Sequence, residues 1–382
     1  MRVVIAPDSF KESLSASGVA QAIAEGVRAA IPDAETVCVP MADGGEGSLD
    51  AVLAATRGER RSARVRNANN EIVEAAWGWL GEGRAFVEMA TAAGLEQIDP
   101  KDRQVLKASS FGVGQLIAEA VEAGATHIIM GLGGSATNDA GAGVIQALGV
   151  RLLDANGQSL APGGAALAEL HSIDMSAVDP RLAKIRFELA VDVDNPLCGE
   201  RGASAIFGPQ KGASEADVAQ LDAALARFAD VLQSHTGQDF RNLPGMGAAG
   251  GIGLPMKALF DATFQPGIEL VAALSGLDEL LDGADLVITG EGRMDRQTLL
   301  GKTPAGVARH AKERSIPVIA LAGSLGEGYE ALYEAGITAA FSIAPGPVSL
   351  EDACTNAAQY LRQRSQAVMQ IWMSAQSVSK PV

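Results

Sequence analysis

Two carboxylates that close an apolar run are among the residues of this sequence best placed to do chemistry. Asp192 and Asp194 follow the run Ile185–Val191, and the alternation of a strand sends both side chains to the same side. A pair of carboxylates at a strand end serves either to bind a metal ion or to remove a proton. Two like charges without partners are costly to bury, which favours a functional site over a structural one.

Further polar residues stand in loops that follow the first two apolar runs. Asp8, Ser9 and Lys11 come after the first run, and Asp43 and Glu46 lie in a glycine-rich loop after the second. If these runs are parallel strands, their carboxyl ends share one edge of the sheet, where open α/β proteins bind ligands. Lys11 is suited to bind phosphate as a point charge, and the alternative for it alone is an exposed loop lysine.

The segment Gly131–Ala136 fits the G-x-G-x-x-A form of a dinucleotide-binding loop. It follows an apolar run, precedes a predicted helix, and is followed about twenty residues later by Asp154, as in an NAD-binding fold. Asp139 argues against that interpretation, because it would repel a pyrophosphate at the helix N-terminus unless Mg²⁺ lay between them. Capping of the helix by Asn138 or Asp139 is the alternative. Capping and ligand contact are compatible, and both stay open.

A third glycine-containing loop follows a later apolar run and carries Glu291, Arg293 and Asp295. Lys302 stands just before the next predicted helix. The segment is not a Walker A loop, because Arg296 occupies a position where that motif needs glycine. Its place at the end of a strand favours a ligand site over a solvated charged loop.

The elements that must position these loops alternate between strand and helix at both ends of the chain. Hydrophobic patterning predicts strands at residues 2–6, 37–39, 60–66, 71–79, 84–88, 126–130, 185–191, 285–289, 317–321 and 337–343. It predicts helices at residues 14–31, 46–56, 111–123, 138–148, 214–233, 303–313, 326–335 and 350–372.

These elements predict a two-domain α/β protein. Residues 1–60 and 266–375 would form one discontinuous, Rossmann-like domain with a doubly wound parallel sheet. Residues 61–265 would be an inserted α/β domain with mixed or antiparallel strands, because turn residues join the strands between 60 and 88 as hairpins. Residues 376–382 are expected to be a frayed tail.

Charge and composition exclude several classes of protein. The 382 residues carry a net charge of -16, which disfavours nucleic acid and anionic membranes as partners. The three cysteines have no metal-ligand spacing, which favours a reducing compartment. No apolar run is long enough for a secretion signal or a bilayer span, so a cytoplasmic location is expected.

Taken together, the motifs resemble the bacterial glycerate kinase family of type I. Six motifs occur in order over nearly the whole chain, to about residue 372: APDSFKESL from Ala6, ADGGEG from Ala42, GLGGSATNDAG from Gly131, DVDNPL from Asp192, FGPQKG from Phe207 and GEGRMD from Gly290. The resemblance implies a two-domain α/β enzyme that phosphorylates D-glycerate with ATP and Mg²⁺, giving 2-phosphoglycerate and ADP.

Within that reaction we predict a role for each residue. Asp192 is the base toward the glycerate hydroxyl, with Asp194 as its orienting or metal-binding partner, and Lys11 meets phosphate. Predicted substrate ligands are Asp8, Ser9, Asp43, Glu46, Arg293 and Lys302. Predicted nucleotide ligands are Gly133, Gly134, Ser135, Thr137, Asn138, Lys211 and Glu291, where main-chain amides at the start of a helix would cradle the phosphates. Predicted metal ligands are Asp139, Asp194 and Asp295.

Three alternatives stay open at this point. The kinase would instead act on the 3-hydroxyl of glycerate. An NAD-dependent dehydrogenase of a small hydroxy acid would use the loop Gly131–Ala136 together with Asp154. A binding protein for sugar acids would close on its ligand without catalysis. The sequence leaves the oligomeric state open as well, either monomer or homodimer.

Overall fold

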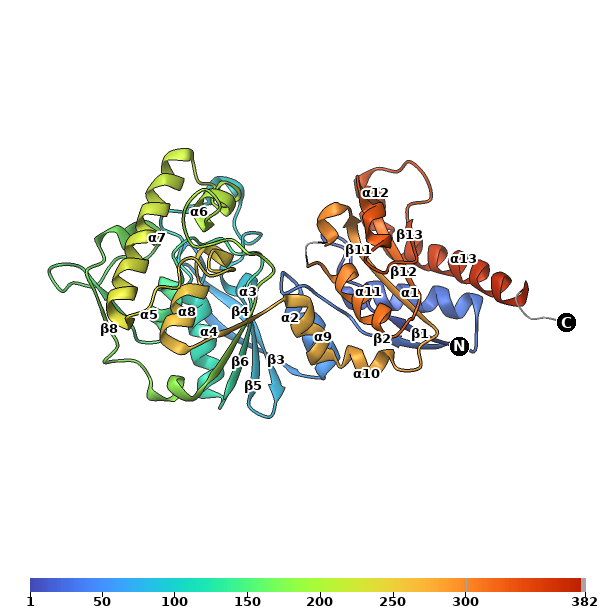
Figure 1. Ribbon diagram of the computed structural model, residues 1–382, viewed down its shortest axis with the longest axis horizontal. Helices are drawn as coiled ribbons and strands as arrows, with labels where there is room; N and C mark the ends of the chain where they lie inside the picture. The colour runs from blue at the N-terminus through green and yellow to red at the C-terminus, as the bar shows by residue number, and fades with distance from the viewer. Residues whose placement is uncertain (300, 379–382) are drawn as a thin grey trace. The chain divides into compact units, whose positions relative to one another are not determined.

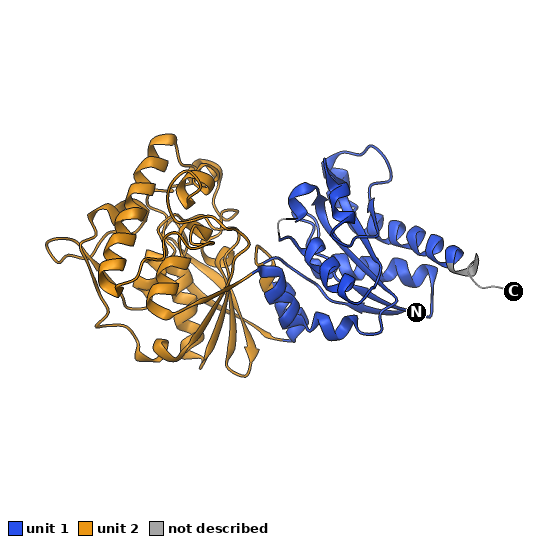
Figure 2. Ribbon diagram, in the orientation of Figure 1, with its two compact units in different colours: residues 1–43, 50–57, 266–382 blue, residues 44–49, 58–265 orange. Residues whose placement is uncertain are grey.

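The computed structural model describes residues 1–299 and 301–378, and within them the chain forms two compact units. Unit 1 contains residues 1–43, 50–57 and 266–382, and unit 2 contains residues 44–49 and 58–265. The short segment 44–49 therefore groups with unit 2, although the residues on both sides of it belong to unit 1 (Figure 2). No described helix is long and apolar enough to cross a bilayer.

Unit 1 is built on a parallel sheet of five strands in the order β13-β12-β11-β1-β2 (Figure 1). The strands are β1 (Arg2–Ile5), β2 (Glu35–Cys38), β11 (Leu286–Met294), β12 (Val318–Leu325) and β13 (Ala339–Ser342). Val3, Val4 and Ile5 of β1 are all fully buried, so the sheet is covered on both faces, as parallel sheets require.

The helices of unit 1 enclose this sheet. They are α1 (Ala16–Ala30), α2 (Ser48–Thr56, which begins in unit 2), α9 (Gly267–Ser275), α10 (Leu277–Leu281), α11 (Thr303–Glu313), α12 (Leu350–Thr355) and α13 (Ala357–Val378). Helix α1 begins at Ala16, two residues after the predicted start, and the Ser15 hydroxyl before it accepts a hydrogen bond from the amide of Gly18. It packs so closely on α13 that a Cβ on Gly26 would lie 2.3 Å from the carbonyl oxygen of Arg362.

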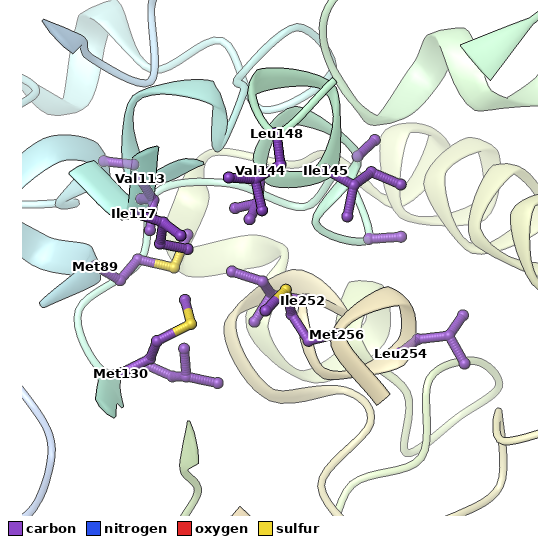
Figure 3. Packing of buried hydrophobic residues seen from close by; sticks show 14 of the residues in the cluster. Met89, Val113, Ile117, Met130, Val144, Ile145, Leu148, Ile252, Leu254 and Met256 are labelled. Carbon is purple, nitrogen blue, oxygen red and sulfur yellow. The ribbon is translucent and has the colours of Figure 1, made fainter. Parts of the chain in front are cut away.

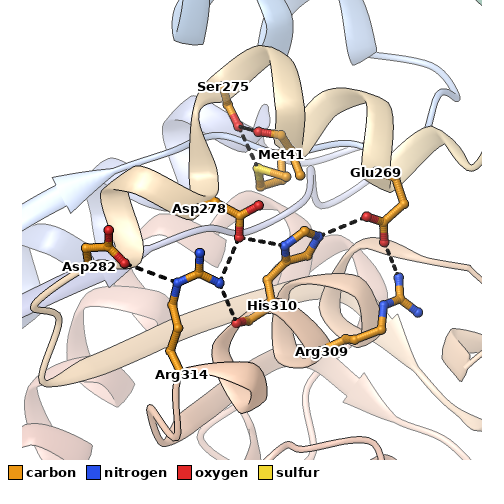
Figure 4. Close-up of polar contacts among 9 residues, drawn as sticks. Met41, Glu269, Ser275, Asp278, Asp282, Arg309, His310 and Arg314 are labelled. Carbon is orange, nitrogen blue, oxygen red and sulfur yellow. Dashed lines mark hydrogen bonds and ion pairs between the residues drawn. The ribbon is translucent and has the colours of Figure 1, made fainter.

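A histidine joins α9, α10 and α11 (Figure 4). His310 of α11 places Nδ1 3.0 Å from Asp278 of α10 and Nε2 3.1 Å from Glu269 of α9. Arg314 lies 2.9 Å from the same Asp278 carboxylate. The histidine therefore has a structural place between three helices, in keeping with the absence of a catalytic pattern around it in the sequence.

The order of the strands creates a switch point between β1 and β11. From β1 the chain passes through α1 to β2 on one side, and from β11 it passes through α11 to β12 on the other. At such a point the connecting segments leave the sheet in opposite directions, which opens a crevice at the carboxyl ends of the two strands. Asp8 follows β1 and Glu291 lies in the last part of β11, so both stand at this point.

Unit 2 contains a mixed sheet of six strands in the order β10-β9-β6-β5-β4-β3. Strands β3 (Glu59–Arg66), β4 (Ile72–Gly81) and β5 (Arg84–Glu88) pair antiparallel, as the turn residues predicted. Strands β6 (His127–Gly131), β9 (Arg186–Ala190) and β10 (Thr263–Gln265) continue the sheet in parallel with β5. A separate hairpin pairs β7 (Arg151–Leu153) with β8 (Ser172–Asp174).

Helices pack around this second sheet. They are α3 (Met89–Ala93), α4 (Phe111–Glu122), α5 (Ala142–Ala147), α6 (Ala203–Phe207), α7 (Glu215–Thr236) and α8 (Gly253–Phe260). Buried side chains of α4, α5 and α8 meet in one core (Figure 3). Gly114 allows α4 to approach α5 closely, because a Cβ there would lie 2.4 Å from the carbonyl oxygen of Val144. Ser214 caps α7, as predicted, by accepting from the amide of Asp217.

The structure confirms the fold class and corrects three local predictions. The helix predicted over 138–148 begins only at Ala142, because Ala140 and Gly141 both have positive φ angles. The helix predicted over 326–335 is a single 3-10 segment, Tyr329–Tyr333. The helix predicted over 350–372 is divided into α12 and α13, and α13 continues to Val378. The remainder of the predicted tail, 379–382, lies outside the described residues.

Candidate active site

Three carboxylates gather at the switch point of unit 1. Asp8 and Asp43 follow β1 and β2, and Glu291 stands on β11. Burial, followed by the charge of Asp43, raises the pKa of Asp8 to about 7, and the charge of Glu291 acts in the same direction. The three groups therefore form one region of concentrated negative charge, which would be relieved by a proton or by a cation.

Short hydrogen bonds orient Asp8. Its Oδ1 accepts from the amide of Ser9 at 2.6 Å and lies 3.3 Å from the Ser9 hydroxyl. Its Oδ2 accepts from the hydroxyl of Thr303 at 2.5 Å. Thr303 is the first residue of α11, so this helix and the β1 loop are tied together through the carboxylate. Sequence-based reasoning missed this role of Thr303.

Glu291 is held by its own neighbours on the chain. Its carboxylate accepts from the hydroxyl of Thr298 at 2.5 Å and lies 3.4 Å from the amine of Lys302. Burial raises the pKa of Glu291, and the Thr298 hydrogen bond and the Lys302 charge oppose that rise. Lys302 is thus brought to the carboxylates of unit 1, at a distance that leaves its amine open to further acceptors.

Arg293, near the end of β11, pairs with Asp295, which follows the strand. The guanidinium of Arg293 donates to Asp295 at 3.2 Å, and Arg293 is exposed. Asp295 also accepts from the amide of Gln297 at 2.9 Å. Lys11, in the loop after β1, is exposed as well.

In unit 2, Asp139 is fully buried and organises the loop between β6 and α5. Its carboxylate accepts from the amide and the hydroxyl of Ser110, at 2.8 and 2.9 Å. It also accepts from the amides of Gly141 and Gly143, each at 3.2 Å. The bond to Gly143 satisfies an amide in the first turn of α5, but the N-cap residue of this helix is Gly141, so neither Asn138 nor Asp139 is the N-cap that the sequence suggested.

The residues beside Asp139 are also buried. Thr137 and Asn138 are fully buried, and Asn138 Nδ2 donates to the hydroxyl of Ser204 at 2.8 Å. Lys211 is 2% exposed and donates to the carbonyl oxygen of Thr137 at 2.6 Å. Burial lowers the pKa of Lys211 to about 7, and the charge of Asp139 opposes this effect. The structure thus brings four of the predicted residues together in unit 2.

The glycines of the same loop meet the segment 44–49. The amide of Gly133 donates to the carbonyl oxygen of Gly44 at 3.1 Å. Gly134 has a φ of +71° and is exposed, whereas Ser135 is buried and forms a β-bridge with Gly94. The loop is therefore anchored on both sides by main-chain contacts.

Glu88, at the end of β5, is a buried carboxylate that sequence reasoning missed. It accepts from the amides of Gly47 and Leu49, at 3.1 and 2.7 Å. These amides lie at the start of α2, so Glu88 caps this helix and ties the segment 44–49 to unit 2. Burial raises the pKa of Glu88 to about 7, against the effect of both hydrogen bonds. Glu46 of the same segment is exposed.

Asp192 and Asp194 follow the end of β9, as expected, but they do not continue the strand. Strand β9 ends at Ala190, and both aspartates are exposed in the loop that follows. Asp194, with 74% of its side chain exposed, forms two contacts of 2.9 Å with the guanidinium of Arg201. The strand alternation that placed the two side chains together therefore does not apply.

Comparison with known proteins agrees with the sequence motifs. The model of the "Glycerate kinase family" matches residues 3–373. The chain belongs to the glycerate kinase family. The resemblance predicted from the motifs is thereby confirmed.

Individual relatives of this glycerate kinase family member cover it almost completely. A glycerate 2-kinase of Escherichia coli is 50% identical over 92% of this chain and 93% of its own. A glycerate kinase of Halalkalibacterium halodurans is 48% identical over 97% and 98%. The crystal structure of a proposed glycerate kinase 2 from Salmonella typhimurium LT2 matches with a TM-score of 0.89, 47% identity and 99% coverage of both chains.

The fold of this family member removes the structural basis of the dehydrogenase alternative. In a dinucleotide-binding unit the strand after the glycine loop and its helix lies parallel to the first strand. Here β7 instead pairs antiparallel with β8 in a separate hairpin. Asp154 closes its own turn by accepting from the amides of Asn156 and Gln158. The match of Gly131–Ala136 to the dinucleotide-binding motif therefore does not indicate a dinucleotide site.

Proposed function

We propose that this protein transfers the γ-phosphoryl group of ATP to the 2-hydroxyl of D-glycerate, giving 2-phosphoglycerate and ADP. The observation that carries the proposal is membership of the glycerate kinase family across residues 3–373, together with 50% identity to a relative named glycerate 2-kinase. Phosphoryl transfer needs little covalent chemistry from the protein, so catalysis depends on positioning and on compensating charge. Both units offer residues for these tasks.

Mg²⁺ fits the donor set of unit 1. Among residues 1–299 and 301–378 no three Asp, Glu, His or Cys side chains form a ready cage for a metal. Mg²⁺ does not need one, since it is commonly held by one or two carboxylates and completed by water and phosphate oxygens. Asp8 and Asp43 supply two such carboxylates, close enough for one charge to raise the pKa of the other. Bound there, Mg²⁺ would neutralise phosphate charge.

The three aspartates that the sequence suggested as metal ligands have other partners. Asp139 uses its oxygens for four hydrogen bonds, Asp194 pairs with Arg201, and Asp295 pairs with Arg293. The hydrogen bonds of Asp139 occupy its oxygens, and the guanidinium partners of Asp194 and Asp295 already compensate their charges. Burial and the charges of Asp43 and Glu291 instead raise the pKa of Asp8, so a cation would be favourable there. The proposal therefore assigns Mg²⁺ to Asp8 and Asp43, with Glu291 adding to the negative field.

Exposed groups are proposed to meet the substrates. Asp192 accepts the proton of the attacking hydroxyl, a role that its open position after β9 allows. Lys11 contacts phosphate, and the main-chain amides of Gly134 and Ser135 contribute to the cradle. The amides of Gly133 and Ala136 are excluded from it, because they already donate to the carbonyl oxygens of Gly44 and Ala93.

The carboxylate of glycerate requires a cation. Lys302 and Arg293 are the proposed partners, and Lys302 is the better placed of the two because it already lies 3.4 Å from Glu291 in the carboxylate cluster. Ser9 and Glu46 remain proposed substrate ligands, because they lie in the loops that follow β1 and β2. A cytoplasmic location, the lack of a nucleic acid partner, and a monomeric or homodimeric state complete the proposal. The net charge of -16 supports the second of these, because it repels phosphodiester backbones.

A coupled assay of ADP release tests the proposed activity. The purified protein is incubated with excess Mg·ATP and with D-glycerate, L-glycerate or no acceptor. We expect ADP release that depends on D-glycerate and falls to background when EDTA is added. Equal ADP release in all three mixtures, or none in any, would overturn the proposal. A binding protein for sugar acids would show a thermal shift with glycerate and no ADP.

A further inference from the structure

We propose that Lys211 is a positioning residue that fixes the loop 132–141 from within unit 2, and that it does not touch the nucleotide. The proposal rests on the proposed function, since it concerns the loop that would cradle phosphate. It replaces the sequence-based expectation that Lys211 is itself a phosphate ligand.

Lys211 is buried and bound to the loop backbone. Its side chain is among the largest that are fully buried in the molecule, and its amine donates to the main-chain oxygen of Thr137. The turn around it is fixed as well, because Arg103 donates to the carbonyl oxygen of Gln210 at 2.8 Å. An amine placed in this way already donates a hydrogen bond to the loop backbone, and it has no exposed surface from which to reach a ligand in solvent.

Asp139 is a second buried residue that holds this loop. Its negative charge favours the protonated form of Lys211, while desolvation disfavours that form. Asp139 in turn holds Ser110 at the start of α4 and Gly143 in the first turn of α5. Ser110 extends the network, since its hydroxyl accepts from the amide of Val144 at 3.1 Å. Lys211 and Asp139 therefore fasten the loop to three separate elements.

The loop needs such fastening, because its own conformation is unfavourable. Ala140 has a φ of +50°, a left-handed conformation that is costly for a residue with a Cβ. Among the described residues, Thr137 Oγ1 and Asn138 Oδ1 are buried without a hydrogen-bond partner. Strained residues and unpaired polar atoms persist only where the surroundings impose them, and they are typical of functional loops.

Acetylation of the native protein tests burial against ligand contact without any mutation. The full chain is treated with N-hydroxysuccinimidyl acetate, with and without Mg·ATP, and modified lysines are followed by mass spectrometry. Lys101, whose side chain is 74% exposed, is the internal control. We expect Lys211 to react at least about a hundredfold more slowly than Lys101 in both conditions, because modification requires local opening. Labelling of Lys211 at the rate of Lys101, with protection by Mg·ATP, would overturn the proposal.

Hydrogen exchange tests the positioning role itself. Lys211→Met keeps the length of the side chain and removes its charge, and Lys101→Met is the matched control. We expect exchange of the amides in 133–144 to rise about tenfold or more in Lys211→Met and to stay unchanged in Lys101→Met. Unchanged exchange in a folded Lys211→Met protein would overturn the proposal. If that variant does not fold, the acetylation of the wild-type protein still decides. Neither readout needs glycerate turnover, so a failure here is distinct from a failure of the proposed function.

Discussion

The amide of Gly133 donates to the carbonyl oxygen of Gly44 at 3.1 Å, joining two loops that lie far apart in the sequence. The contact leaves no space for a side chain, since a Cβ on Gly133 would lie 2.4 Å from the Cα of Gly45. Two glycine-rich motifs that the sequence presented separately are thus one packed structure in unit 2. This contact and the hydrogen bonds from Gly47 and Leu49 to Glu88 hold the segment 44–49 in unit 2.

Replacement of Gly133 by alanine should separate the two loops. We expect Gly133→Ala to lower the free energy of unfolding by about 1–3 kcal/mol, the usual cost of overpacking, and to lower kcat/KM for glycerate. Gly346→Ala is the control, because a Cβ at Gly346 would meet no atom within 4 Å. Urea unfolding and steady-state kinetics measure the two effects. Equal stability of both variants would contradict the close packing.

Magnesium binding should depend on pH through Asp8. Because Mg²⁺ must displace a proton from a carboxyl group whose pKa is about 7, its affinity should rise between pH 6 and pH 8. We therefore expect a larger increase of Tm with Mg²⁺ at pH 8 than at pH 6, and none in Asp8→Asn. The exposed Asp33→Asn is the control. The same response to Mg²⁺ in Asp8→Asn would remove Asp8 from the metal site.

The stability of the protein should fall as the pH rises toward neutrality, and Glu88 should account for part of the fall. Its pKa is about 7 in the folded state and near the ordinary glutamate value of 4.5 in the unfolded state, so between these values the folded state binds more protons. The contribution of Glu88 is fully present below about pH 4.5 and is lost as the pH rises through about 7. We expect Glu88→Gln to flatten the dependence of the unfolding free energy on pH between 5 and 7.5. The control is Glu82→Gln, on a side chain that is 88% exposed. A parallel pH dependence in wild type and Glu88→Gln would refute this origin.

Lys211 should make the free energy of unfolding rise with pH above neutrality, whereas Glu88 makes it fall below neutrality. Its pKa is about 7 in the folded state and about 10.5 in the unfolded state, so between these values the unfolded state binds more protons. Stability should therefore rise between pH 7 and pH 9.5 in the wild-type protein, and this rise should be absent in Lys211→Met. Urea unfolding at the two pH values measures the difference, with Lys101→Met as the control.

Removal of the proposed base should affect turnover and leave the fold intact. We expect Asp192→Asn to lower kcat by about two to four orders of magnitude, with Tm unchanged, because its side chain is exposed. Asp154→Asn, in a hairpin turn of the same unit, is the control. A kcat for Asp192→Asn close to that of the wild type would remove Asp192 from the mechanism.

Helices and strands whose bounds depend on neighbouring residues in the chain could be predicted from the sequence. Helix α11 begins and ends at the predicted residues, 303 and 313, and β5 spans the predicted 84–88. Periodicity and terminal residues suffice for such elements. The placement of Asp8 and Asp43 at one sheet edge followed from the carboxyl ends of two predicted parallel strands, and the structure has the same two strands side by side.

Contacts between residues that are distant in the sequence could not be predicted. Asp139 bonds to Ser110, which is distant in the sequence. Nothing local indicates that Lys211 is buried, because its turn has the glycines and polar residues typical of a surface loop. Thr303 was taken only for the start of a helix. Glu88 ends a strand that was predicted correctly, yet its partners at Gly47 and Leu49 become neighbours only in the fold.

The position of the transferred phosphoryl group tests the central claim most directly. Proton-coupled phosphorus NMR of the product from D-glycerate and Mg·ATP distinguishes the two hydroxyls, because phosphorus on C2 couples to one vicinal proton and phosphorus on C3 to two. The account predicts a doublet, with ADP formed in equal amount. A triplet would contradict the assignment to the 2-hydroxyl, and the absence of any phosphate ester would contradict the glycerate kinase activity itself.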